Sequence, residues 1–123
     1  MEVAVDSHAL LWYLSKNPKL TTKAVDVLDK ATRIIVSTIV LLELLYILQK
    51  FGRERKFKNL LNSIGSEKYL VYPVDLALVR DCAKLPKSLE MHDRLIVATA
   101  QIFNVSLVTK DKQIAEVYKR VIW

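Results

Sequence analysis

Residues 33–48 read RIIVSTIVLLELLYIL, and within them a strand pattern changes to a helix pattern. This change indicates the architecture of the chain. The first five residues form a short apolar run, as in a strand that is buried on both faces. From Thr38 onward the pattern predicts a helix, and Gly52 is expected to end it. A buried strand that leads directly into a helix is the building unit of α/β proteins with a parallel sheet.

Glu43 is the only charged residue between positions 38 and 48. No helical face through this run is polar enough to keep a carboxylate in water, and an unpaired buried carboxylate is costly unless it becomes neutral. No Lys or Arg lies within one helical turn of Glu43. Its partner is therefore expected to be distant in sequence or to be a bound cation, which Asp6, Asp93 and Asp111 could share.

Strand and helix patterns alternate along the rest of the chain. Further strands are expected at residues 2–5, 69–73, 106–108 and, at an edge, 121–123; helices are expected at 7–15, 21–31, 53–64, 75–85, 89–103 and 112–118. Continuously apolar strands that alternate with helices predict a mainly parallel sheet of four to five strands, covered on both faces. No internal repeat or linker is present, so a single α/β domain over residues 1–123 is expected.

Composition limits the class of protein. A chain of 123 residues with 52% hydrophobic content, two glycines and three prolines is neither disordered nor of low complexity. Glu2 and Asp6 interrupt the first apolar stretch, so no signal peptide is expected. The longest apolar run is too short to cross a bilayer, which argues against a membrane partner. Cys82 is the only cysteine, so no internal disulfide is possible and a cytoplasmic location is expected.

The charge balance is basic. Nineteen Lys and Arg against thirteen Asp and Glu give +6. If four of the acids form one pocket, nine acids remain against nineteen basic residues, and the rest of the chain carries +10. A basic body around an acidic pocket suits a polyanionic partner. A basic charge that reflects only solubility or average composition remains an equal alternative.

The expected topology places the four acids near one edge of the sheet. Asp6 follows the first strand directly, and Asp111 follows the fourth shortly after its end. Asp93 lies in the opening turn of its helix, and Glu43 lies further along its own, from where its side chain leans back toward the helix start. Ligands of open α/β sheets bind beyond the carboxyl ends of the strands, so the four carboxylates are expected to share one crevice.

Helix capping is the alternative role for three of these acids. Asp6 and Asp111 each precede a helix, and Asp93 could complement a helix dipole, while Asp75 has the same placement and is interpreted as a cap. Glu43 has no capping role at its position. Four like charges in one place repel unless a divalent cation compensates them. Hard oxygen ligands without a His or Cys cluster favour Mg²⁺ or Mn²⁺ over zinc.

Four segments carry a family resemblance: VAVDSHALLWYL (3–14), STIVLLELL (37–45), LEMHDRLIVATA (89–100) and LVTKD (107–111). They resemble the signature blocks of PIN-domain ribonucleases, in the family's order and over nearly the whole chain. The resemblance implies a PIN-like α/β/α fold. It also places the family's metal-binding, catalytic acids on Asp6, Glu43, Asp93 and Asp111, and polar supporting groups on Ser7, Ser37 and Thr109.

The size and the wording of these blocks are most similar to the toxin of a VapBC toxin–antitoxin pair. That resemblance implies hydrolysis of RNA with Mg²⁺ or Mn²⁺, by in-line attack that leaves a 5′-phosphate and a 3′-hydroxyl. It also implies a cognate antitoxin protein as partner, and a homodimer is expected.

Other polar and aromatic residues have less specific interpretations. Arg94 could bind a phosphate or pair with an acid, and His8 and His92 lack ligand spacing, which favours packing or surface roles. Trp12 and Tyr13 are expected to be core or dimer-contact aromatics rather than base-stacking platforms. A basic cluster is expected to be a solvated face that could steer RNA: Lys50, Arg53, Arg55, Lys56 and Lys58.

Other functional classes fit the sequence less well than a nuclease. A phosphoacceptor receiver domain needs two adjacent acids after its first strand, and only Asp6 is present. A haloacid-dehalogenase-type phosphatase needs a second Asp where His8 stands. A catalytically inactive PIN-fold binding module and an RNA-processing nuclease without a toxin role remain open.

Overall fold

The computed structural model describes all 123 residues and contains the expected strands and helices in the expected order. The strands are β1 (Glu2–Val5), β2 (Arg33–Ser37), β3 (Tyr69–Tyr72), β4 (Ser106–Val108) and β5 (Val121–Ile122). The helices are α1 (Ser7–Leu14), α2 (Thr22–Lys30), α3 (Thr38–Lys50), α4 (Glu54–Ile64), α5 (Leu76–Ala83), α6 (Met91–Phe103) and α7 (Lys112–Val117). The predicted bounds differ from these by two residues or fewer at each end. None of the helices combines the length and the apolar character that a membrane span requires.

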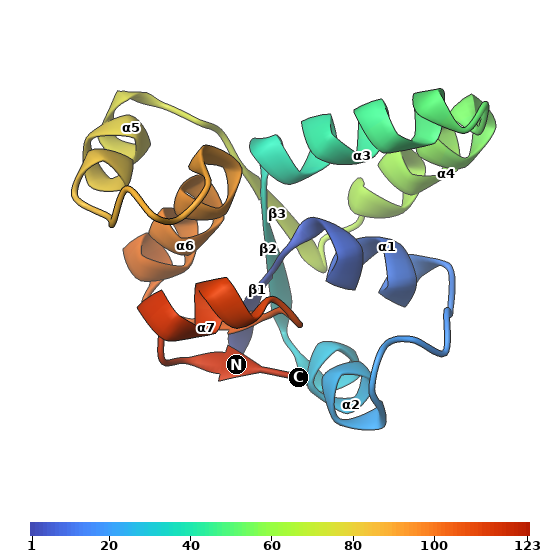
Figure 1. Cartoon of the computed structure of the whole chain (residues 1–123). Coiled ribbons are helices and arrows are strands. Elements are labelled where there is room, and N and C mark those ends of the chain that lie inside the picture. Colours follow the sequence, from blue (N-terminus) through green and yellow to red (C-terminus); the bar gives the residue numbers. More distant parts are fainter.

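The five strands form one sheet in the order β3-β2-β1-β4-β5, and every neighbouring pair is parallel. The expectation of a mainly parallel sheet of four to five strands is therefore confirmed. Helices α1, α2 and α4 lie on one side of the sheet and α5 and α6 on the other, while α3 crosses the end of the sheet (Figure 1). These three layers are the PIN-like α/β/α arrangement that the sequence predicted.

The core lies between the sheet and its helices. The central strands bury both faces, and Val3 of β1 and Ile34, Ile35 and Val36 of β2 have no exposed surface. This explains why their sequences are continuously apolar rather than alternating. The edge strand β3 is only partly buried, in keeping with its mixed sequence YLVY.

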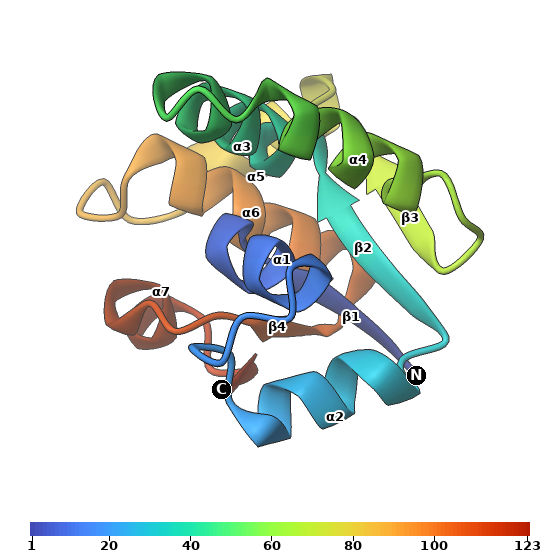
Figure 2. The ribbon, with the colours of Figure 1, turned by 90° about the vertical axis from the view of Figure 1, so that its right-hand side faces the viewer.

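The chain changes direction at β1, which is the middle strand. From β1 it proceeds to β2 and β3 on one side, then returns through α5 and α6 to β4 and β5 on the other side. Figure 2 shows β1 and β2 side by side beneath α3, with α6 behind them. The connections after β1 and β4 therefore diverge, which creates a crevice at the carboxyl ends of these two strands.

Helix α3 differs from the expectation in one respect. Val40, Leu44 and Leu48 are buried, but Leu42 is 59% and Tyr46 is 67% exposed. An apolar sequence on every face therefore did not produce a helix buried on every face. The reason is that α3 lies at the end of the sheet, so only its inner side meets other elements (Figure 1).

Candidate active site

The crevice at the carboxyl ends of β1 and β4 holds a cavity of 180 Å³ whose lining is dominated by carboxylates. All four acids singled out from the sequence reach it, from the start of α1, the middle of α3, the first turn of α6 and the start of α7. The lining residues are Asp6, Ser7, His8, Glu43, Glu90, Asp93, Ile96 and Asp111. The predicted convergence of distant acids is therefore present in the structure.

Asp6 is held by two hydrogen bonds. Its Oδ1 accepts from the backbone N–H of Ala9 at 2.9 Å, and its Oδ2 accepts from the hydroxyl of Thr109. Burial raises the pKa of the Asp6 carboxyl; the bonds from Thr109 and Ala9 lower it, and the neighbouring Asp111 raises it. Asp6 is thus the N-cap of α1 and a wall of the acidic cavity at once. Capping and site roles, which the sequence presented as alternatives, occur together.

Asp111 combines the same two roles. Its Oδ1 accepts from the N–H groups of Gln113 at 2.8 Å and Ile114 at 3.2 Å, so it caps α7 while its Oδ2 forms no hydrogen bond. The hydroxyl of the buried Thr109 accepts from the Asp111 N–H at 3.0 Å and donates to Asp6. Thr109 therefore connects the two acids and supports both, in the position that the family resemblance gave it.

Glu43 is less buried than its sequence environment suggested, because a quarter of its side chain is exposed. The expected deep burial of Glu43 is therefore not present, although Glu43 does line the cavity. Its Oε1 accepts from the hydroxyl of Ser7 at 3.0 Å, and its Oε2 lies 3.7 Å from Nδ1 of His92. Ser7 thus supports an acid directly. His92 is exposed beside the cavity, in the surface position that was one of its two expected roles.

Asp93 lies in surroundings that are unfavourable for a charged carboxylate. The pKa of its carboxyl is raised to about 6, mainly by burial and then by the charges of Asp111, Glu43, Glu90 and Asp6, in that order. No hydrogen bond offsets these effects. Because Asp93 responds electrostatically to every other acid of the cavity, the five carboxylates form one interacting cluster.

Two predicted supporting residues lie outside the cavity. Ser37 is buried and caps α3, since its hydroxyl accepts from the N–H of Ile39 at 3.4 Å. Nε of Arg94 donates to the carbonyl of Leu89 at 2.7 Å, and Arg94 forms no ion pair with an acid of the cavity. Both residues stabilise the segments that carry site residues, and neither lines the cavity.

Sequence reasoning missed Glu90 and the position of His8. Glu90 lies three residues before Asp93, a spacing that puts two residues on one side of a helix and could have identified it. His8 lies two residues after Asp6 and lines the cavity as an exposed side chain. His8 has no metal-ligand spacing with another residue in the sequence, so its place at the cavity could not be predicted. The first turn of α1 brings it to the acids.

The cluster suits a hard divalent cation chemically, although its side chains are spread apart. No three His, Cys, Asp or Glu side chains stand close enough to bind one ion directly. The donors are carboxylate oxygens, and no Lys or Arg lines the cavity. Mg²⁺ keeps several of its waters and is commonly bound through only one or two carboxylates, so this spacing is compatible with it.

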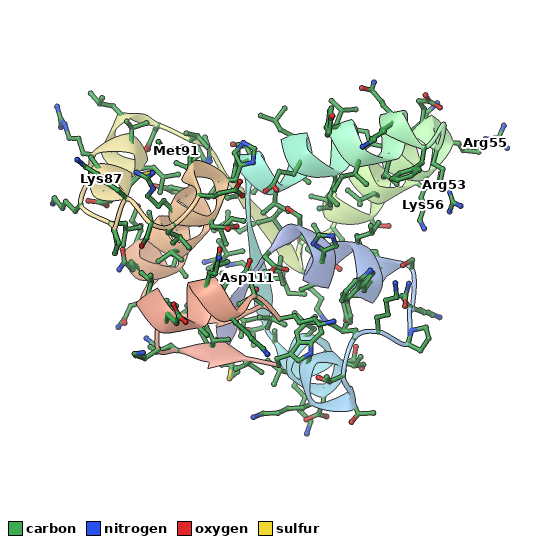
Figure 3. All side chains as sticks on the ribbon, viewed as in Figure 1. Arg53, Arg55, Lys56, Lys87, Met91 and Asp111 are labelled. Carbon is green, nitrogen blue, oxygen red and sulfur yellow. The ribbon has the colours of Figure 1, made fainter.

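The predicted basic cluster lies away from these acids. Arg53, Arg55 and Lys56 lie at the far end of the α3–α4 hairpin, whereas Asp111 lies near the middle of the molecule (Figure 3). Arg53 and Arg55 are exposed and Lys56 is partly exposed, as a solvated face requires. Their distance from Asp111 means that any effect on a bound polyanion would be long-range steering.

Comparison with known protein families shows the family to which this chain belongs. Residues 3–120 match the sequence model of the PIN domain, and the chain therefore belongs to the PIN-domain family. No curated protein matches the chain in sequence.

Solved structures share its fold at low sequence identity. VapBC2 from Rickettsia felis, bound to a DNA fragment from its promoter, is 17% identical with a TM-score of 0.74, covering 100% of this chain and 98% of that chain. A toxin–antitoxin complex from Klebsiella pneumoniae is 18% identical with a TM-score of 0.75, covering 98% and 96%. VapC20 from Mycobacterium tuberculosis, described as a Sarcin-Ricin loop cleaving toxin, is 15% identical with a TM-score of 0.75, covering 93% of each chain.

Proposed function

We propose that this protein is a ribonuclease dependent on Mg²⁺ or Mn²⁺ that hydrolyses phosphodiester bonds at the acidic cavity. The observation that carries the proposal is the convergence of five carboxylates at the carboxyl ends of β1 and β4, without a Lys or Arg in the lining: Asp6, Glu43, Glu90, Asp93 and Asp111. Such a cluster is unfavourable for folding unless a bound cation compensates it. Membership of the PIN-domain family supports the same reaction class.

The residues divide into fixed and adjustable groups. Asp6 and Asp111 are held by helix caps and by Thr109, so their carboxylates are positioned before any ligand arrives. Glu43 and Asp93 have fewer hydrogen bonds and can move toward a ligand. A cation held by these acids would polarise the scissile phosphate and lower the pKa of a water. When ionised, Glu43 or Asp93 can accept the proton that this water loses.

The proposed substrate is RNA and the proposed role is that of a toxin. The sequence blocks resemble PIN-domain ribonucleases, and similar folds occur in VapBC complexes and in a toxin described as cleaving the Sarcin-Ricin loop. The proposed partner is an antitoxin protein, because the similar structures include toxin–antitoxin complexes. An Arg of that partner could enter the acidic cavity and form charge-assisted hydrogen bonds with the carboxylates.

A homodimer is proposed from the outer face of α3. Leu42 and Tyr46 are exposed and border a groove of 430 Å³ that also contains Glu43 and His92. Large exposed apolar side chains beside a groove mark an interaction surface. A second copy bound there would cover this apolar face next to the acidic cavity.

The test of the reaction is cleavage of single-stranded RNA by the purified protein, with Mg²⁺ or Mn²⁺ and with a chelator. Cleavage is expected only with the cation, and Asp6→Asn should abolish it, because Asn keeps the helix cap but removes the charge. Asp75→Asn is the matched control: Asp75 caps α5 through a bond of 2.9 Å from Leu78 N–H but lies outside the cavity. If wild type leaves RNA intact with both cations, the inactive binding module becomes the better interpretation. Cleavage that survives Asp6→Asn would contradict the proposed site.

A further inference from the structure

A second hollow opens directly beside the acidic cavity. It has a volume of 450 Å³ and shares Asp6, His8 and Asp111 with that cavity, so the two form one continuous depression. Its other walls differ in chemistry: they are the indole of Trp12 and the side chains of Lys110 and Lys112. A ligand that occupies both parts therefore meets carboxylates at one end and an aromatic ring with cations at the other.

Trp12 is partly buried, so packing holds one part of its side chain in place while another part stays accessible to a ligand. It packs against the core from α1, and its ring lies 5.4 Å from that of His8 and 6.0 Å from that of Trp123, between centroids. The expectation of a core aromatic is therefore only partly met, because the ring also lines the open hollow. Tyr13 differs, since its hydroxyl donates to Asp29 at 2.7 Å on another side of α1.

Cations surround the Trp12 ring. The ammonium groups of Lys19 and Lys110 lie 5.7 and 5.9 Å from the ring centroid, and Lys112 lines the same hollow. All three lysines are exposed at the surface, and none of them forms a salt bridge. The arrangement thus offers unpaired positive charge around an aromatic face, immediately outside a cluster of carboxylates.

This combination fits a single-stranded polynucleotide better than a compact anion. An aromatic face binds an unpaired base by stacking, and neighbouring lysines bind its phosphates. Each part of the depression then meets the substrate group of matching chemistry: carboxylates near the reacting phosphate, lysines near the flanking phosphates and indole against a base. A helical stem would not present a base to Trp12, because its bases are already stacked and paired.

We propose that Trp12 is a stacking platform for an unpaired base next to the scissile phosphodiester, and that Lys110 and Lys112 bind the adjacent phosphate. This inference rests on the proposed ribonuclease function for its reaction, but the binding itself can be measured without cleavage. It assigns the hollow to single-stranded RNA and makes unpaired structure around the cleavage position a requirement of the substrate.

The first test uses intrinsic fluorescence. Trp12 and Trp123 are the only tryptophans of the chain and lie together, so the emission of the unmodified protein reports on the surroundings of Trp12, which lines this hollow. A short single-stranded oligoribonucleotide, added with a chelator to prevent cleavage, should quench the emission. An abasic oligomer of the same length and charge should quench it far less. Equal quenching by both oligomers, or none by either, would overturn the stacking platform.

The second test uses variants. Trp12→Phe keeps an aromatic face and should bind the oligoribonucleotide close to wild type, whereas Trp12→Leu should weaken binding roughly tenfold, the scale of one base stack. In cleavage, Trp12→Leu should raise KM for single-stranded RNA more than it lowers kcat. Phe51→Leu is the control, because Phe51 is an exposed aromatic at the far end of α3, away from the hollow. Circular dichroism melting shows whether Trp12→Leu is folded, and the fluorescence test stands if it is not.

The role of Lys110 and Lys112 is tested separately, by the salt dependence of RNA binding. Replacing Lys110 and Lys112 with Ser should reduce the slope of log affinity against log salt by about 0.7 for each phosphate that the variant no longer binds. An unchanged slope would remove the phosphate interactions from the proposal. Cleavage with full activity in Trp12→Leu would overturn the stacking platform and leave the ribonuclease standing. Base-dependent quenching by a protein that cleaves no RNA would support the platform and contradict the ribonuclease.

Discussion

Thr109 shows how a single hydroxyl organises the acidic cavity. It donates to Asp6 and accepts from the N–H of Asp111, and it is almost fully enclosed at the end of β4. Removing it would leave a carboxylate oxygen without its donor and a backbone N–H without its acceptor. Two carboxylates from opposite ends of the chain thus depend on one side chain for their relative position.

Thr109→Val should therefore lower the free energy of unfolding by about 2 kcal/mol, the usual cost of leaving buried polar groups unpaired. It should also abolish cleavage, and Thr109→Ser should restore most of both. Urea unfolding followed by circular dichroism measures the first effect. Thr99→Val is the control, since Thr99 is equally buried but bonds only to Leu95 within α6. A Thr109→Val protein with normal cleavage would show that the link between the acids is dispensable.

Asp93 predicts a pH dependence of stability. Its pKa is raised from 3.8 to about 6 in the folded protein, so between these pH values the folded state holds a proton that the unfolded state has lost. The contribution of this group to stability is therefore present below pH 4 and is lost as the pH rises through 6.

Asp93→Asn should raise the melting temperature of the cation-free protein at pH 7.5 and change it little at pH 4. Differential scanning calorimetry of wild type and variant over pH 4–8 measures the difference. Mg²⁺ or Mn²⁺ should raise the melting temperature of wild type at pH 7.5 more than that of the variant, because a ligand stabilises the state that binds it. A difference between the two proteins that is constant with pH would contradict the raised pKa.

At the scale of elements, helix α3 has two faces with separate tasks. Val40, Leu44 and Leu48 attach it to the core, while Leu42 and Tyr46 point away from the buried side. Glu43 lies between these faces, next to Leu42, and reaches the acidic cavity. The apolar character of this helix therefore combines core packing with an exposed face that we assign to a second copy of the chain.

Replacing Leu42 and Tyr46 together with Lys should convert a dimer into a monomer, because two charges would have to be buried at the interface. Light scattering after size exclusion gives the mass directly. Both positions are exposed, so the monomer should melt as a folded protein. Leu61→Lys, on the exposed side of α4, should leave the dimer intact. A wild-type protein that is monomeric at high concentration would contradict the proposed interface.

At the scale of the whole molecule, the charges are separated in space. The carboxylates gather in the crevice at the centre of the sheet, and basic residues occupy the surrounding surface, including the far end of the α3–α4 hairpin (Figure 3). This distribution attracts a polyanion to the molecule as a whole and repels it from the cavity unless a cation is bound there. Binding of the cation and of the scissile phosphate should therefore be coupled, whereas the neighbouring hollow with Lys110 and Lys112 can bind RNA without the cation.

Expression of the chain without a partner should slow the growth of a bacterial host, as the toxin proposal requires. Asp6→Asn and Asp93→Asn should relieve the effect at equal protein level, because they remove charges of the cavity. Asp75→Asn should remain harmful, since Asp75 caps α5 and lies outside the cavity. Growth curves with immunoblots of soluble protein give the comparison. Normal growth with abundant wild-type protein would contradict the toxin role.

The order of strands and helices, the parallel sheet and the approach of the four acids to one crevice were predictable from the amino-acid sequence. Short apolar runs such as residues 33–37 have one stable arrangement when they alternate with helices. Parallel strands then bring Asp6 and Asp111 to the same edge, because each follows the carboxyl end of its strand. Asp75 was also evident as a capping residue, since a cap depends on local sequence alone.

The burial and the neighbours of each side chain became known only from the packed molecule. Several features depend on how each helix is rotated and where it lies on the sheet. They are the partial exposure of Glu43, the location of Ser37 and Arg94 outside the cavity, and the location of Trp12 beside it. Periodicity within one helix does not contain this information, because the neighbours that set the rotation come from distant parts of the chain. The acids were predictable from strand ends, whereas the surface around them required the packed molecule.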